Sequence, residues 1–144
     1  MSAFPPFSPS LPAAQADPAA VFVFPGIRFS LLTPRLLRVE LSPHDRFEDR
    51  PSQVFWQRRQ PLPAFTADRQ ADSLTLRGEH FTLLYHPQAG QQPAAGFSLT
   101  LAHSGAEIHL DDPNPGQLPG TARTLDETNG PIQLTPGLLS RAGW

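Results

Sequence analysis

The sequence predicts an all-β fold, an antiparallel β-sandwich, and two observations lead to this prediction. The 144 residues include 18 prolines and 10 glycines, which are too many helix breakers for long helices. Between the breakers, short segments alternate apolar and polar residues, which is the pattern of a half-buried strand. Such segments recur about every 8–12 residues with turn signals between them, as expected for a sandwich or barrel.

The first strands are predicted near the N-terminus. Val21–Phe24 is expected to form an edge strand that stops at Pro25-Gly26. Two longer strands are expected at residues 28–32 and 36–42, joined by a turn at Thr33-Pro34-Arg35. Their alternation predicts these inward-facing side chains: Phe29, Leu31, Leu37, Val39 and Leu41.

The later strands follow the same pattern after a polar stretch that runs from Pro43 to Ser52. The sequence predicts two hairpins, one around Gly78 and one across residues 103–106. The strand segments expected after the polar stretch are 54–56, 62–66, 73–77, 79–85, 97–102 and 107–110. The aromatic residues assigned to strands, and therefore to the core, are Phe55, Trp56, Phe81, Tyr85 and Phe97.

The length indicates one domain. Residues 1–20 are rich in proline and alanine and are predicted to be a disordered lead-in. Residues 21–144 are predicted to form the sandwich module. Within the module, residues 110–144 show little alternation and many Gly, Pro and Thr residues, so an irregular tail is expected there. Such a tail commonly carries function or packs on a partner, as a pocket loop or an interdomain loop.

Charge and composition exclude several classes of partner. The formal net charge is −2, so no basic field exists to attract nucleic acid. No apolar run approaches the roughly 20 residues of a membrane-spanning helix, and no secretory signal is recognisable. The chain has no cysteine, which rules out disulfides and cysteine metal sites. We therefore expect a cytoplasmic protein without a cofactor and without a nucleic-acid or membrane partner.

Candidate chemistry is sparse. Asp45, Glu48 and Asp49 lie close together, and carboxylates so placed suit acid–base catalysis or cation binding. Their arginine neighbours favour a solvated mixed-charge loop instead. His109, Asp111 and Asp112 match no zinc spacing and are expected to end a strand, so no metal site is predicted. A Ser/His/Asp triad stays open, although no Gly-x-Ser-x-Gly elbow is present.

An ordered string of motifs nevertheless resembles the N-terminal module of bacterial family 31 glycoside hydrolases, the α-glucosidase and α-xylosidase family. The resemblance covers about Phe24 to Trp144 and is clearest in the tail. The motifs that carry it are Arg35-Leu36-Leu37-Arg38-Val39-Glu40, Phe47-Glu48-Asp49-Arg50-Pro51-Ser52, Glu79-His80-Phe81-Thr82-Leu83-Leu84-Tyr85, Gly120-Thr121-Ala122-Arg123-Thr124-Leu125-Asp126, Gly130-Pro131-Ile132-Gln133-Leu134 and Gly137-Leu138-Leu139-Ser140-Arg141-Ala142-Gly143-Trp144.

The resemblance implies a galactose-mutarotase-like sandwich that packs on a (β/α)8 catalytic barrel. In that family the barrel supplies both catalytic aspartates of a retaining mechanism. This chain does not contain the barrel, so we expect it to be inactive alone and its sandwich to be incomplete at the C-terminal end. An α-linked glucoside or xyloside would be its ligand only in the assembled enzyme.

The resemblance also points to a pocket loop. By position, Leu139-Ser140-Arg141-Ala142 is the segment expected to reach the sugar pocket, with Arg141 and Ser140 as the substrate-binding residues. An interdomain or surface salt bridge is the alternative role of Arg141. Two other functions stay open for the whole chain, a free-standing carbohydrate-binding sandwich protein and a structural sandwich without a ligand.

Overall fold

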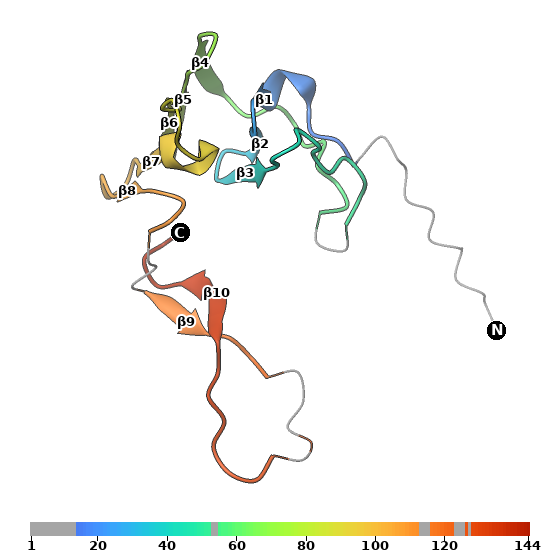
Figure 1. Cartoon of the computed structure of the whole chain (residues 1–144), viewed down its shortest axis with the longest axis vertical. Helices are drawn as coiled ribbons and strands as arrows, with labels where there is room; N and C mark the ends of the chain where they lie inside the picture. The colour runs from blue at the N-terminus through green and yellow to red at the C-terminus, as the bar shows by residue number, and fades with distance from the viewer. Residues whose placement is uncertain (1–13, 53–54, 113–115, 123–125, 127) are drawn as a thin grey trace, which may run out of the picture. The chain divides into compact units, whose positions relative to one another are not determined.

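The computed structural model describes residues 14–52, 55–112, 116–122, 126 and 128–144, and these residues form an all-β, sandwich-like structure with antiparallel sheets, as predicted (Figure 1). The chain divides into two units, Met1–Asp111 and Asp112–Trp144. The strands of the first unit are β1 (Val21–Phe24), β2 (Ile27–Thr33), β3 (Leu36–Leu41), β4 (Phe65–Arg69), β5 (Leu74–Gly78), β6 (Phe81–Tyr85), β7 (Phe97–Leu101) and β8 (Glu107–Ile108).

The first unit contains two sheets. One has the strand order β1-β2-β3 and the other has the order β4-β5-β6-β7-β8, with every neighbouring pair antiparallel. Within each sheet, strands that are consecutive in the chain are neighbours, because turns return the chain beside the strand it has just left. The predicted hairpins at 33–35, near Gly78 and at 103–106 are therefore confirmed.

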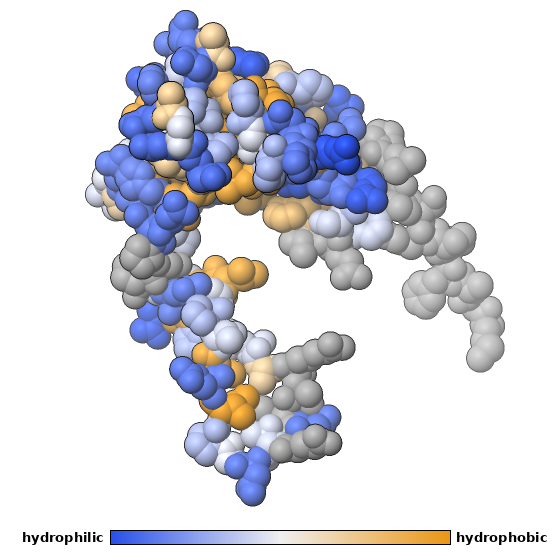
Figure 2. Space-filling view, viewed as in Figure 1, coloured by the Kyte–Doolittle hydropathy of each residue, from blue (hydrophilic) through white to orange (hydrophobic). Residues whose placement is uncertain are grey.

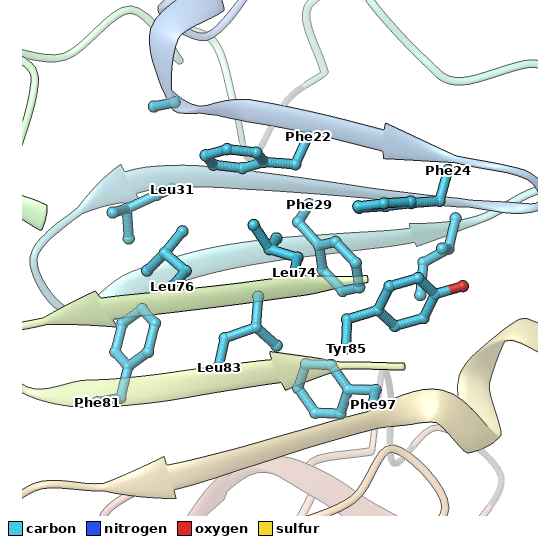
Figure 3. Packing of buried hydrophobic residues seen from close by; sticks show 12 residues of the cluster. Phe22, Phe24, Phe29, Leu31, Leu74, Leu76, Phe81, Leu83, Tyr85 and Phe97 are labelled. Carbon is cyan, nitrogen blue, oxygen red and sulfur yellow. The ribbon is translucent and has the colours of Figure 1, made fainter. Parts of the chain in front are cut away.

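The core lies between these two sheets, and Figure 3 shows their side chains pointing toward one another. Tyr85, the last residue of β6, has its ring centroid 5.0 Å from the rings of both Phe24 and Phe29. Phe29 also stacks on Phe97 of β7 at 6.1 Å. The buried cluster consists of Ala20, Phe22, Phe24, Ile27, Phe29, Leu31, Leu74, Leu76, Phe81, Leu83, Tyr85 and Phe97. The inward positions predicted from the alternation of β2, β5 and β6 are thus confirmed.

Strand β2 is buried on both faces, with six of its seven residues buried. Its inner face, with Phe29 and Leu31, meets the opposite sheet. The buried outer-face positions include Arg28 and Ser30, because successive side chains of a strand point to opposite faces. This double burial places a charged side chain inside the protein and sets the position of the site described below.

Several predicted elements differ from the structure. Phe55 and Trp56 lie in no strand and are half-buried, and Val54 lies outside the described residues. The backbone N–H of Phe55 donates to Ser52 Oγ at 3.1 Å, so this N–H is not paired with a neighbouring strand. The strand expected at 62–66 lies further along, at Phe65–Arg69. Leu41 was expected to face the core but is 55% exposed at the end of β3.

The segment before β1 is ordered where it is described. Residues 18–20 form a short 3-10 turn, η2 (Pro18–Ala20), in which Asp17 accepts a hydrogen bond from the N–H of Ala19 at 3.0 Å. Ala20 is completely buried. This corrects the prediction of a disordered lead-in for residues 14–20, because the turn anchors the chain to the core. Residues 1–13 of that prediction lie outside the described residues.

The second unit, Asp112–Trp144, contains the strands β9 (Gln117–Pro119) and β10 (Pro136–Ser140). They pair antiparallel, with Pro136 opposite Pro119 and Ser140 opposite Gln117. The irregular tail predicted for 110–144 is therefore corrected, because part of it forms this two-stranded ribbon. Alternation did not signal the ribbon, since β9 has only three residues and β10 begins with Pro136-Gly137.

Candidate functional site

The outer face of the β2–β3 pair carries a cluster of charged side chains. Register places Arg28 opposite Glu40 and Ser30 opposite Arg38. Because Phe29 and Leu31 face the core, these four residues share the opposite face of the sheet. The alternation predicted Arg38 and Glu40 on the outer face, and the structure confirms it.

Residues 47–49 and Arg58, which come from the segment between β3 and β4, lie over this face. Arg28 Nε lies 2.7 Å from Glu40 Oε2, and Arg28 Nη1 lies 2.7 Å from Asp49 Oδ1. The guanidinium also lies 5.0 Å above the ring of Phe47. Burial lowers the pKa of Arg28, but hydrogen bonds to Glu40 and Asp49 more than offset this effect, so its pKa is raised.

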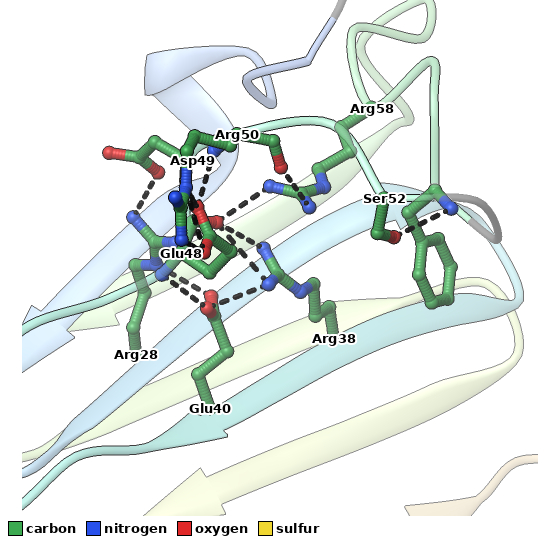
Figure 4. Close-up of polar contacts among 9 residues, drawn as sticks. Arg28, Arg38, Glu40, Glu48, Asp49, Arg50, Ser52 and Arg58 are labelled. Atoms are coloured by element: carbon green, nitrogen blue, oxygen red, sulfur yellow. Dashed lines mark hydrogen bonds and ion pairs between the residues drawn. The ribbon is translucent and has the colours of Figure 1, made fainter.

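The backbone carbonyl of Glu48 is the meeting point of three guanidinium groups (Figure 4). It accepts from Arg58 Nη1 at 2.6 Å, from Arg28 Nη2 at 3.2 Å and from both Nη atoms of Arg38 at 3.3 Å. Three cations therefore lie within a few ångströms of one neutral oxygen. The pKa of Arg38 is lowered, mainly because burial disfavours its charge, with the nearby charges of Arg58 and Arg28 acting in the same direction.

Arg58 is the most deeply buried of these arginines, at 2% exposure. It donates to two backbone carbonyls, those of Glu48 at 2.6 Å and Arg50 at 2.9 Å. Its Nε is buried and has no hydrogen-bond partner among the described residues. No described carboxylate forms a salt bridge with it either. Sequence reasoning missed Arg58, because two consecutive arginines, Arg58-Arg59, have the pattern of an exposed basic pair.

The three carboxylates predicted together have separate partners. Glu48 binds Arg50, whose side chain is 86% exposed, at 2.6 Å. Hydrogen bonds from the Arg50 side chain and backbone lower the Glu48 pKa to about 2. Asp49 binds Arg28, and Asp45 accepts from the N–H of Gly26 at 2.6 Å. The exposed Glu48–Arg50 pair agrees with the mixed-charge interpretation, whereas Asp49 serves a half-buried cluster.

These side chains border a cavity of about 260 Å³, which we call the arginine cleft. It lies wholly within the first unit. The lining residues that matter for its chemistry are Gln15, Arg28, Ser30, Arg38, Asp49 and Arg58. Three guanidinium groups and one carboxylate in a recess of this size make an electropositive pocket.

A second hollow, of about 480 Å³, lies where β1 and β6 end, and we call it the tyrosine groove. The residues that define its chemistry are Phe24, Asp72, Tyr85, Gln88, Gln91 and Pro93. Tyr85 is 2% exposed and Phe24 is 3% exposed, so neither presents a free aromatic face for stacking. Burial raises the pKa of the Tyr85 hydroxyl.

The predicted pair Ser140 and Arg141 lies in the ribbon of the second unit, together with the paired strand β9. Ser140 ends β10, and its Oγ accepts from the N–H of Ala142 at 3.0 Å. Arg141 lies in the turn that follows, where its backbone N–H donates to the carbonyl of Gly116 at 2.8 Å. Residues 139–142 are thus half strand and half turn, and Arg141 is exposed.

The ribbon unit exposes its apolar residues. Among the residues described from 112 to 144, none is buried. Leu138 is 101% exposed and Leu139 is 72% exposed, while Ile132 and Leu134 are both 41% exposed. Hydrophobic surface is visible on this unit in Figure 2. Residues Arg123-Thr124-Leu125 of the resembling motif lie outside the described residues.

In the described part of the chain, no group of three or more His, Asp or Glu side chains could hold a metal ion. No helix there is long and apolar enough to cross a membrane. No protein-family model matches the sequence, and no curated protein matches it.

Proposed function

We propose that this chain is a non-catalytic N-terminal module of an α-glycoside hydrolase, with a galactose-mutarotase-like sandwich that packs on a (β/α)8 catalytic barrel. One observation carries the docking role: no described residue of the ribbon unit, Asp112–Trp144, is buried. The sequence resemblance to family 31 modules supplies the identity of the partner. The cytoplasm remains the expected compartment, on sequence grounds alone.

The exposure of the ribbon supports a partner for physical reasons. A two-stranded ribbon is at best marginally stable in water by itself. Leu138 and Leu139 are adjacent in sequence on β10, with most of their surface in solvent. Exposed apolar side chains that gather on one element mark interaction surfaces. A barrel surface that covers them would stabilise the ribbon and bury these leucines.

The chemistry of the first unit supports a non-catalytic role. Retaining hydrolysis needs two carboxyl groups roughly 5–5.5 Å apart, one of them protonated at working pH. Glu48 is held ionised by Arg50, and Asp49 is paired with Arg28. We therefore expect the purified chain not to hydrolyse aryl α-glucosides or α-xylosides. In the assembled enzyme, Ser140 and Arg141 would contact an α-linked glucoside or xyloside.

Co-expression with the catalytic barrel of a bacterial family 31 enzyme tests the proposal. We expect the tagged chain to retain the barrel through purification, and the complex to cleave p-nitrophenyl α-glucoside or α-xyloside. The double substitution Leu138→Asp and Leu139→Asp should abolish co-purification. Leu62→Asp is the matched control, since Leu62 is 51% exposed outside the ribbon. Failure of the wild-type chain to retain barrels of both specificities, or hydrolysis by the chain alone, would contradict the proposal.

A free-standing carbohydrate-binding protein is the second candidate, and the tyrosine groove is the observation that favours it. Asp72, Gln88 and Gln91 supply polar groups to its lining, and its volume of about 480 Å³ lies within the range of small-ligand sites. Calorimetric titration with glucose, xylose and maltose separates the two candidates. Micromolar affinity that is lost in Asp72→Ala would favour the binding protein over the accessory module.

A further inference from the structure

The arginine cleft carries one positive charge more than its carboxylates neutralise. Arg28, Arg38 and Arg58 bring three cations to the carbonyl of Glu48. Only Glu40 and Asp49 form salt bridges with Arg28 and Arg38 in the described part of the chain, while the carboxylate of Glu48 pairs with Arg50. The three arginines and these two carboxylates, Glu40 and Asp49, therefore carry a net charge of +1.

The excess charge lies on Arg58, which is the group least able to carry it alone. A buried guanidinium without a carboxylate is costly, because water no longer solvates it. Two neutral carbonyls satisfy its Nη atoms in part, and its buried Nε has no partner among the described residues. An unpaired N–H on a side chain that is 2% exposed and lines a cavity has the features of a prepared donor.

The Glu48 carbonyl oxygen also has more hydrogen-bond donors around it than it has lone pairs. An oxygen with two lone pairs receives contacts from four N–H-bearing nitrogens, two of them at 3.3 Å. The N–H groups of Arg38 form only long hydrogen bonds to this oxygen, so they can donate to a nearer acceptor when one is present. An anion with two or three oxygens would supply the acceptors that a single carbonyl cannot.

We propose that the arginine cleft binds a small oxyanion, a carboxylate or a phosphate group, with Arg58 and Arg38 as its main donors. The planar fork of a guanidinium matches the paired oxygens of both groups. Ser30 and Gln15 line the same cavity and offer further donors. The cavity of about 260 Å³ suits a small ion or the charged end of a metabolite. The site is independent of barrel docking.

Calorimetric titration of the full chain at constant ionic strength tests this site, with inorganic phosphate and acetate as probes and chloride as the background ion. We expect saturable binding of at least one probe. Asp49→Asn removes one of the two neutralising carboxylates from a position where the side chain is 52% exposed. It should tighten binding about tenfold, because a nearby repulsive charge is lost. A gain of affinity cannot arise from misfolding.

Arg58→Met keeps the unbranched apolar stem of the side chain and removes its donors, so binding should be lost. Circular dichroism of this variant verifies its fold, and if it fails to fold, Asp49→Asn decides alone. Preference for phosphate over acetate, or the reverse, identifies which oxyanion the ligand bears. Two results would overturn the proposal: no saturable binding of either probe by the wild type, or equal binding by the wild type and Asp49→Asn.

Discussion

Arg28 and Glu40 lie directly opposite each other on β2 and β3, and Arg28 Nε is 2.7 Å from Glu40 Oε2. Their side chains are only 11% and 13% exposed. Glu40 also binds Arg38, with its Oε1 2.8 Å from Arg38 Nη2. One buried carboxylate thus holds two of the three arginines on the outer face of the sheet, and its removal leaves both cations without their shared partner.

Glu40→Gln is therefore expected to destabilise the chain by about 3 kcal/mol, since breaking a buried pair leaves an uncompensated charge. Urea unfolding followed by circular dichroism measures the loss. Glu79→Gln is the control, because the Glu79 side chain is 74% exposed, and it should change stability by less than about 0.5 kcal/mol. Equal midpoints for the two variants would show that the pair contributes no stability.

Neighbouring leucines on β6 provide a test of the core. Leu83 is completely buried between the sheets, whereas Leu84 points the other way and is 44% exposed. Leu83→Ala should cost about 3 kcal/mol, because it removes buried methyl groups and leaves a cavity. Leu84→Ala should cost less than about 0.5 kcal/mol. Thermal melts of both variants check the difference, and similar melting temperatures would place the core elsewhere.

Gly26 is required for two reasons, its φ of 78° and the proximity of Pro93. A Cβ at Gly26 would lie 2.6 Å from Pro93 Cγ, whereas one at Gly90, with φ of 80°, would meet nothing within 4 Å. We expect Gly90→Ala to cost about 1 kcal/mol from backbone strain alone. Gly26→Ala should cost about 1–3 kcal/mol more, through overpacking. Chemical denaturation of both variants separates the two effects. Equal stabilities would show that Pro93 moves aside without loss of stability.

The Glu48–Arg50 pair predicts a weak acid dependence. The Glu48 pKa falls from 4.5 to about 2 in the folded chain, so the stabilisation is fully present above pH 4.5. It is lost as the pH falls from 4.5 toward 2, because protonation then breaks the pair. Glu48→Gln should remove this part of the pH dependence and leave the neutral-pH stability nearly unchanged, since water screens an exposed pair. Melting temperatures measured from about pH 6 to about pH 2.5 test this expectation.

Amide hydrogen exchange should separate the ribbon from the sandwich. The described residues of Asp112–Trp144 include none that is buried, while β2 and β6 contribute much of the core. Local opening therefore costs less in the ribbon, and its amides should exchange fastest in the isolated chain. The amides of β2 and β6 serve as the internal reference. Protection of β9 and β10 equal to that of β2 would contradict the exposure of the ribbon.

The sequence predicted those strands whose alternation is strong. Phe29 and Leu31 set the inner face of β2, and Leu74 and Leu76 set that of β5, because side chains that face the core recur with a period of two. Strand β4 was misplaced, since its residues from Thr66 to Arg69, at a sheet edge, are all exposed and carry no such period. Only the pairing with β5 reveals it.

The arginine cleft could not be predicted from the sequence. Arg58 becomes buried because it and residues 47–50 lie against a sheet face that is formed earlier in the chain, and its partners are main-chain oxygens with no signature in the sequence. Asp45, Glu48 and Asp49 were recognised as a charged group, but the partner of each was not. The roles of Ser140 and Arg141 remain predictions, to be tested with the assembled enzyme.

The two hydrogen bonds from the Arg58 guanidinium to the carbonyls of Glu48 and Arg50, here called the arginine clamp, affect which sequence changes residues 42–58 can tolerate. Because the acceptors belong to the main chain, replacing the side chain at either position leaves the clamp in place. Adding or deleting one residue between Ser42 and Arg58 would instead move those carbonyls out of reach of the guanidinium groups. Loop length is therefore under tighter constraint than loop composition, and a library that varies the residues at 48 and 50 should yield many folded members.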